Sequence, residues 1–281
     1  MGKYIWILIL AFISCKSKDT THITPTSTHL PEDSLLNYSY MLTQMDNDSV
    51  IGSGTGEIIH YAEKYYLVTN FHVLTGRDAK TNSNFKDSRG TVSDIAMVFQ
   101  PKDNKSAFVP MVYPIYNSEG EDNFQVLKFN NQLIDIAVMP IVLPDKAAHY
   151  FFEITDLDTS TSYDSTSRLI FLGFPNGEFI NTWQPTKRET RGVINPQKDH
   201  FDPFVFIDSS PIIGMSGGAL YKSDSYGGYR FFGVISNKVD YTKEAPKMQG
   251  RAVQIKWTLE LIRKMQIENK QAIIGVEYIG K

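Results

Sequence analysis

The sequence predicts an all-β protein whose antiparallel strands form a barrel or a sandwich. Short apolar runs bounded by Gly, Pro, Asn and Asp recur along the chain, and such runs are typical of β-strands. Their number and spacing do not follow the alternation of strands and helices that builds parallel sheets. The 15 Tyr and 17 Phe among 281 residues also favour strands and supply large side chains for a core.

The composition excludes several classes of protein. A formal net charge of −3 is not the electrostatic signature of a nucleic-acid-binding protein, so we expect no nucleic-acid partner. A hydrophobic content of 42% provides enough apolar surface to offset the entropy cost of folding. No stretch reaches the roughly 20 apolar residues that a membrane-spanning helix needs.

The first 14 residues have the pattern of an export signal. Lys3 precedes an apolar run of about ten residues, which suits a signal peptide and is too short to span a bilayer. Residues 12–15, Phe-Ile-Ser-Cys, resemble a bacterial lipobox, which implies lipidation of Cys15. This resemblance implies a lipid-anchored protein of the bacterial cell envelope, at the outer membrane rather than the inner one, facing the periplasm or the exterior. An ordinary secretory signal is the alternative.

Residues 15–34 are rich in Thr, Ser and Pro and predict a flexible tether, in which His22 and His29 are solvated rather than metal ligands. The folded domain is expected over 35–281. Because Cys15 is the only cysteine, the domain contains no disulfide.

Within the domain, strands are expected at 56–59, 65–69, 95–99, 134–143, 169–172, 204–207 and 231–235. The polar segment 155–168 predicts a linker between two halves, at about 35–154 and 169–255. Apolar residues at helical spacing predict an amphipathic helix over 256–268, packed on its own domain rather than on a partner or a membrane.

Residues 214–220, Gly-Met-Ser-Gly-Gly-Ala-Leu, contain a serine in a glycine-rich turn. A nucleophilic serine needs a tight turn with backbone N–H groups directed at the developing oxyanion. Glycine permits the positive φ angles of such a turn. Taken alone, the string fits a purely structural turn equally well, so Ser216 is a candidate nucleophile.

Two further segments supply the other residue types that serine chemistry requires. His72 follows an apolar strand, and a neutral imidazole can take the proton of a serine hydroxyl. Asp135 lies inside the apolar run 133–140, where a lone carboxylate costs several kcal/mol unless it is paired. Asp94 has the same local context and competes with Asp135. Alone, His72 fits a core histidine and Asp135 a locally paired carboxylate.

The chain order His72, Asp135, Ser216 matches one of the known triad orders and differs from those of subtilisins and α/β-hydrolases. With it come the blocks Gly52–Gly56, Leu172–Gly177 and Gly233–Ser236. Together these residues resemble the chymotrypsin-like (trypsin-like) serine peptidase superfamily, in its bacterial form without disulfides. The resemblance runs from about residue 52 to residue 255.

The resemblance implies two antiparallel six-stranded β-barrels followed by a C-terminal α-helix. It implies a triad in which His72 and Asp135 come from the first barrel and Ser216 from the second, with an oxyanion hole formed by the N–H groups of Gly214 and Ser216. The implied reaction is hydrolysis of a protein or peptide substrate through an acyl-enzyme, without a cofactor or metal.

The sequence departs from the digestive members of the superfamily at Met215, where they carry an aspartate that pairs with the activated N-terminus. The turn is then expected to be held by its own packing or to form when substrate binds. Ser210 and Ser236 are implied to contact substrate. Asp208 is expected to be a structural carboxylate; if it faced the pocket, basic substrates would be preferred.

Two other functions fit parts of this pattern. A peptide-binding or regulatory module could use the same fold without turnover. An esterase or other acyl hydrolase would use the same chemistry, but the chain order is not that of α/β-hydrolases and no strand-turn-helix elbow surrounds the serine.

Overall fold

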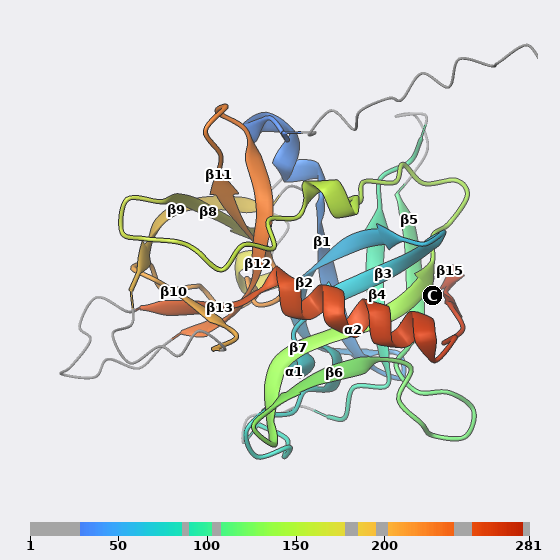
Figure 1. Ribbon diagram of the computed structural model, residues 1–281. Helices are drawn as coiled ribbons and strands as arrows, with labels where there is room; N and C mark the ends of the chain where they lie inside the picture. Colours follow the sequence, from blue (N-terminus) through green and yellow to red (C-terminus); the bar gives the residue numbers. More distant parts are fainter. Residues whose placement is uncertain are drawn as a thin grey trace, which may run out of the picture.

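The computed structural model describes residues 29–85, 90–102, 108–177, 185–194, 202–238 and 249–277. In these ranges the chain is mostly antiparallel β-structure, arranged as a sheet of nine strands and a closed barrel of six (Figure 1). A helix near the C-terminal end follows the barrel. The predicted all-β class, the barrel of the second half and the terminal helix are confirmed.

The nine-stranded sheet contains β1 (Ser39–Asp46), β2 (Ser49–Tyr61), β3 (Lys64–Thr69), β4 (Asp94–Phe99), β5 (Val109–Pro114), β6 (Gln125–Phe129), β7 (Gln132–Val142), β14 (Ile273–Ile274) and β15 (Val276–Glu277). The barrel contains β8 (Arg168–Gly173), β9 (Thr186–Val193), β10 (Phe204–Ile207), β11 (Ala219–Ser223), β12 (Tyr229–Lys238) and β13 (Gly250–Gln254). The helical segments are η1 (Glu32–Asn37), α1 (Phe71–Thr75), η2 (Ile154–Asp156), η3 (Pro175–Gly177) and α2 (Ile255–Ile267).

The first half differs from the expected closed barrel of six strands. Within the described residues its pairing does not run all the way round, and the chain beyond α2 adds two short strands instead. β14 pairs in parallel with β7, and β15 pairs antiparallel with β5. Gly275 joins them beside Tyr113, whose ring lies 2.7 Å from where a Cβ on Gly275 would be. The C-terminal segment therefore contacts the edges of β7 and β5 in the first half.

β7 is buried on both faces, which explains why its sequence is a continuous apolar run rather than an alternating one. Ala137 and Met139 pack into the core of the first sheet, whereas Ile136 and Val138 pack into the core shared with the barrel. A polar residue in such a strand, such as Asp135, lies where water is excluded.

The sheet and the barrel share one hydrophobic core. It joins Ile59 and Val68 of the sheet to Ile170 and Phe231 of the barrel, and Ile262 of α2 packs into it. Helix α2 therefore packs on its own domain, as predicted, and Figure 1 shows it crossing from the barrel over the sheet. No helix in the described ranges is long and apolar enough to cross a membrane.

Residues 29–34, which precede the predicted domain boundary at residue 35, pack on the folded domain. Leu30 pairs through its backbone with Tyr229 of the barrel, and Leu35 is fully buried. Glu32 forms ion pairs with Lys187 and Arg168. The predicted tether is therefore wrong for residues 29–34, because Leu30 and the Glu32 carboxylate contact the barrel although the average composition of the segment is polar. His29 contacts Asp224, and Cys15 and His22 lie outside the described residues.

Candidate active site

His72 lies on the first turn of the short helix α1, directly after β3. Asn70 keeps an extended conformation between the two elements, and Gly76 ends the helix at φ +68°. The carbonyl of His72 accepts hydrogen bonds from the Gly76 N–H at 2.8 Å and from the Gln44 side chain at 3.0 Å. The backbone of His72 is thus fixed from two sides, which sets the direction of its ring.

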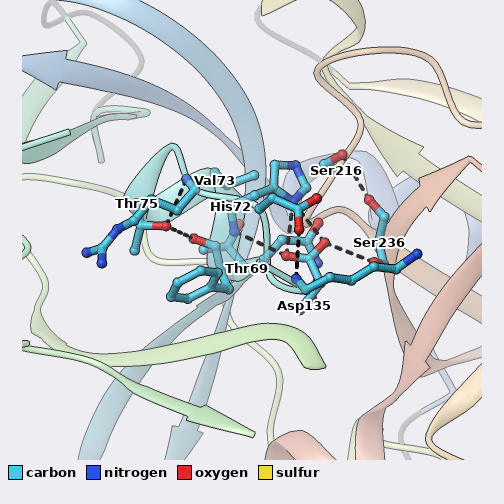
Figure 2. Close-up of polar contacts among 12 residues, drawn as sticks. Thr69, His72, Val73, Thr75, Asp135, Ser216 and Ser236 are labelled. Carbon is cyan, nitrogen blue, oxygen red and sulfur yellow. Dashed lines mark hydrogen bonds and ion pairs between the residues drawn. The ribbon is translucent and has the colours of Figure 1, made fainter. Parts of the chain in front are cut away.

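Asp135 pairs with His72, as the sequence analysis expected. Its carboxylate, on a residue only 5% exposed, lies 2.8 and 3.0 Å from Nδ1 of His72 and accepts the His72 backbone N–H at 3.1 Å (Figure 2). A carboxylate can only accept, so Nδ1 carries the hydrogen and Nε2 is left as the basic nitrogen. The competitor Asp94 accepts a hydrogen bond from its neighbour Ser93 instead.

Opposing effects set the pKa values of this pair. Burial lowers the pKa of His72, but the charge and hydrogen bonds of Asp135 outweigh it, so the pKa lies above the ordinary 6.5. Burial raises the pKa of Asp135, but the attraction of His72 and the hydrogen bonds from His72 and Ser236 outweigh it, so the pKa lies below 3.8. The arrangement therefore stabilises an imidazolium beside a carboxylate.

Ser216 lines the same cleft as His72. Its Oγ donates a hydrogen bond to the backbone carbonyl of Ser236 at 3.0 Å (Figure 2). Among the described contacts there is no hydrogen bond between Ser216 Oγ and the imidazole, although the sequence analysis expected one. Hydrogen bonds of this kind are often unformed without substrate, and the hydroxyl must redirect its hydrogen from the Ser236 carbonyl to form one.

The turn around Ser216 leaves two backbone donors available. Gly214 has φ +93°, a conformation that favours glycine. Within the described residues, neither the N–H of Gly214 nor that of Ser216 donates a hydrogen bond, whereas the N–H groups of Met215 and Gly217 do. Two unpaired donors two residues apart, one of them on the serine itself, are suited to bind an oxyanion.

Ser236 contributes its hydroxyl to the Asp135 carboxylate rather than to an open pocket. The side chain is fully buried and donates to Oδ2 of Asp135 at 2.9 Å. Ser210, the other residue implied to contact substrate, is half-buried in the loop after β10. Asp208 accepts hydrogen bonds from the Thr190 hydroxyl and the Arg191 N–H, which confirms that it is a structural carboxylate.

The cleft beside Ser216 has a volume of about 500 Å³, within the usual range for ligand sites. It has a mixed apolar and polar lining that includes Ile51, Phe85, Asn176 and Ile213. Ile213, next to Gly214, is 83% exposed. Phe85 lies edge-on to the His72 ring, with the ring centroids 6.0 Å apart.

Sequence reasoning missed the residues that hold the pair in place. Asn70 donates its side-chain amide to the backbone carbonyl of Asp135 at 2.7 Å, and Gln44 reaches His72 from β1. Asn70 is a polar residue two positions before His72, at the end of an apolar strand, and this position could have identified it as a support of the site. Gln44 carries no local pattern, because only the pairing of β1 with β2 brings it to α1.

Comparison with known proteins gives a family and a fold. A family model described as a trypsin-like peptidase domain matches residues 54–227. A thermostable serine protease, AL20, from an extremophilic microorganism aligns with a TM-score of 0.50 and 10% identity, over 83% of this chain and 98% of its own. At that identity the similarity shows the fold alone. No curated protein matches the chain.

Two longer proteins also align. A serine endoprotease from Yersinia pestis has 15% identity and a TM-score of 0.49, over 85% of this chain and 66% of its own. The HtrA-type protease AlgW, solved with a tripeptide, has 18% identity and a TM-score of 0.48, over 85% of this chain and 63% of its own. The chain thus spans slightly less than two thirds of the length of either protein.

Proposed function

The chain belongs to the trypsin-like peptidase domain family, and from this premise we propose that it is a serine endopeptidase that cleaves protein or peptide substrates through an acyl-enzyme on Ser216. One observation carries the proposal: His72, hydrogen-bonded to the buried Asp135 carboxylate, lines the same cleft as Ser216.

The reaction follows from the proposed roles of these groups. The Ser216 hydroxyl turns from the Ser236 carbonyl to Nε2 of His72, which takes its proton as Oγ bonds to the substrate carbonyl carbon. The N–H groups of Gly214 and Ser216 stabilise the oxyanion, and Asp135 stabilises the imidazolium. His72 then gives the proton to the departing amine. A water molecule, deprotonated by His72, releases the acyl group and restores the serine.

An active-site probe tests the proposal. The purified domain is treated with a fluorophosphonate, and the site of attachment is determined by mass spectrometry. We expect labelling of Ser216, no labelling of Ser216→Ala, and loss of casein hydrolysis in both Ser216→Ala and His72→Ala. Faster cleavage of a short-chain ester without any peptide cleavage would instead identify an acyl hydrolase.

A catalytically silent peptide-binding module is the second candidate. The hydrogen bond of Ser216 Oγ to the Ser236 carbonyl favours it, because the hydroxyl does not point to the base. Peptide binding that survives Ser216→Ala, with no product and no fluorophosphonate label in the wild type, would support this candidate and exclude the first.

We also propose that residues 1–14 are a lipoprotein signal peptide, that lipidation of Cys15 anchors the domain to the bacterial cell envelope, and that residues 16–28 form the tether. Support comes from the lipobox-like residues 12–15. Expression of the full chain in a bacterium with labelled palmitate should label the wild type and not Cys15→Ala. Equal labelling, or none in either, contradicts the anchor.

A further inference from the structure

Thr55, in the middle of β2, is fully buried and contacts the turn that carries Ser216 (the Ser216 turn, residues 212–218). Its hydroxyl donates to the carbonyl of Gly214 at 2.8 Å, and its backbone N–H donates to the carbonyl of Ser216 at 2.8 Å. The same hydroxyl accepts the N–H of Phe174, at the end of β8, at 3.0 Å. One side chain thus joins β2 to two segments of the barrel.

These bonds fix both carbonyls that belong to the candidate oxyanion residues. The carbonyl of Gly214 belongs to the peptide group 214–215 and that of Ser216 to the peptide group 216–217, so Thr55 restrains the peptide group that directly follows each candidate donor residue. The N–H groups of Gly214 and Ser216 then stay without an acceptor among the described residues. Gly214, Gly217 and Gly218 make the turn intrinsically mobile, so its order depends on such contacts.

The remaining anchors of the Ser216 turn come from the barrel. Met215 is buried in the barrel core, and the Gly217 N–H bonds to Ile235 of β12. In the described ranges, Thr55 alone hydrogen-bonds the turn to the sheet that carries His72 and Asp135. His72 belongs to the first half of the molecule, and the oxyanion donors belong to the second. The hydrogen bonds of Thr55 therefore help to set the distance between the base and these donors.

We propose that Thr55 is a positioning residue that holds the oxyanion donors of Gly214 and Ser216 in register with His72. This inference rests on the proposed peptidase function. Thr55 touches neither substrate nor the reacting atoms in this role. It acts on the rate of the chemical step through the turn.

The test compares three variants with the wild type. Thr55→Val keeps the shape and removes both hydroxyl bonds. We expect kcat to fall about tenfold or more with KM changed by less than about twofold, because loss of one oxyanion donor costs about 10²- to 10³-fold and here donors are misplaced rather than deleted. Thr55→Ser keeps the hydroxyl and should restore most of kcat. Thr190→Val removes a buried threonine hydroxyl bond elsewhere in the barrel and should keep kcat within about twofold.

The inference is overturned if folded Thr55→Val has the same kcat as the wild type, or if kcat falls as much in Thr190→Val as in Thr55→Val. If Thr55→Val does not fold, Thr55→Ala is measured, and a kcat above half the wild-type value overturns it likewise. Amide hydrogen exchange of residues 214–216 tests the restraint on the turn separately from the peptidase function. Faster exchange in Thr55→Val beside an inactive wild type contradicts the peptidase proposal and leaves the restraint intact, whereas unchanged exchange contradicts the restraint whatever the activity.

Discussion

The Asp135 carboxylate receives donors from distant parts of the chain. The His72 ring and backbone N–H come from α1, and the Ser236 hydroxyl comes from β12 of the barrel. A buried carboxylate loses its hydration, and only several well-directed hydrogen bonds offset that loss. Asp135 therefore requires both halves of the fold to be assembled, and so does the basicity of His72.

The pH dependence of activity should report this pair. The pKa of His72 is raised above 6.5. The imidazole therefore stays protonated, and cannot act as a base, until the pH exceeds this raised pKa. We expect the acid limb of kcat/KM above pH 6.5. Asp135→Asn removes the attraction that raises the pKa, so the limb should move to lower pH while kcat falls by roughly 10⁴-fold. A limb that stays in place in the variant contradicts the assigned partner.

Ser236→Ala distinguishes two roles of one residue. If the hydroxyl serves Asp135, as its 2.9 Å bond indicates, its removal raises the pKa of Asp135, and kcat should fall about tenfold with KM unchanged. If the hydroxyl contacts substrate, as the sequence analysis implied, KM rises and kcat is kept. Steady-state kinetics on one peptide decides between them, with Ser210→Ala as the variant expected to change KM alone.

At this scale the sequence predicted the residues that carry local patterns. His72 follows a strand, Ser216 lies among glycines, and Asp135 interrupts an apolar run. It could not predict Thr55, Asn70 or Gln44 as supports, because their roles arise from strand pairing and from the contact between the two halves. The sequence also could not predict which acceptor the Ser216 hydroxyl bonds, because rotation about one bond brings a hydroxyl to several possible acceptors.

Among the elements, β7 and η1 show how far sequence patterns extend. The seven predicted strands all exist, as parts of β2, β3, β4, β7, β8, β10 and β12. β14 and β15 are two residues each, too short for any periodicity. The predicted tether includes Leu30 and the first three residues of η1, because one buried leucine does not alter the average polarity of a 20-residue window.

Leu35 tests whether η1 belongs to the folded domain. It is fully buried in the shared core, so Leu35→Ala should lower the free energy of unfolding by about 2–5 kcal/mol. Glu32→Gln, which removes the partly exposed ion pairs on the same segment, should cost only about 0–1 kcal/mol. Urea denaturation measures both. A Leu35→Ala cost below that of Glu32→Gln would mean that the segment is not packed in solution.

On the scale of the whole molecule, Glu57 lies between the sheet and the barrel. It is fully buried, and its Oε1 accepts the Ser39 hydroxyl and the Ala219 N–H, each at 2.8 Å. Its Oε2 is buried without a partner among the described residues. Burial raises the pKa of this carboxyl well above 4.5, and the two hydrogen bonds only partly offset it. The contact between the halves therefore includes a titratable group.

This group should make the stability fall as pH rises. Above pH 4.5 the unfolded chain releases the Glu57 proton while the folded chain keeps it. The free energy of unfolding therefore declines from the unfolded pKa up to the raised folded pKa, by at most about 1.4 kcal/mol per pH unit. Glu57→Gln should remove this decline, as measured by urea denaturation between pH 5 and 8. The exposed Glu119→Gln is the control, and identical slopes in wild type and Glu57→Gln would contradict the assignment.

The two ends of the described chain are exchanged between the halves. Residues 29–37 lie against the barrel, although they precede the sheet, and residues 273–277 complete the sheet, although they follow the barrel. Neither half is therefore encoded by one continuous stretch. Fragments divided in the linker 158–167 would each lack a segment that packs on them, residues 273–277 for the first and residues 29–37 for the second, so they should fold only when mixed. A chain nicked there should stay together as one particle and melt in one transition.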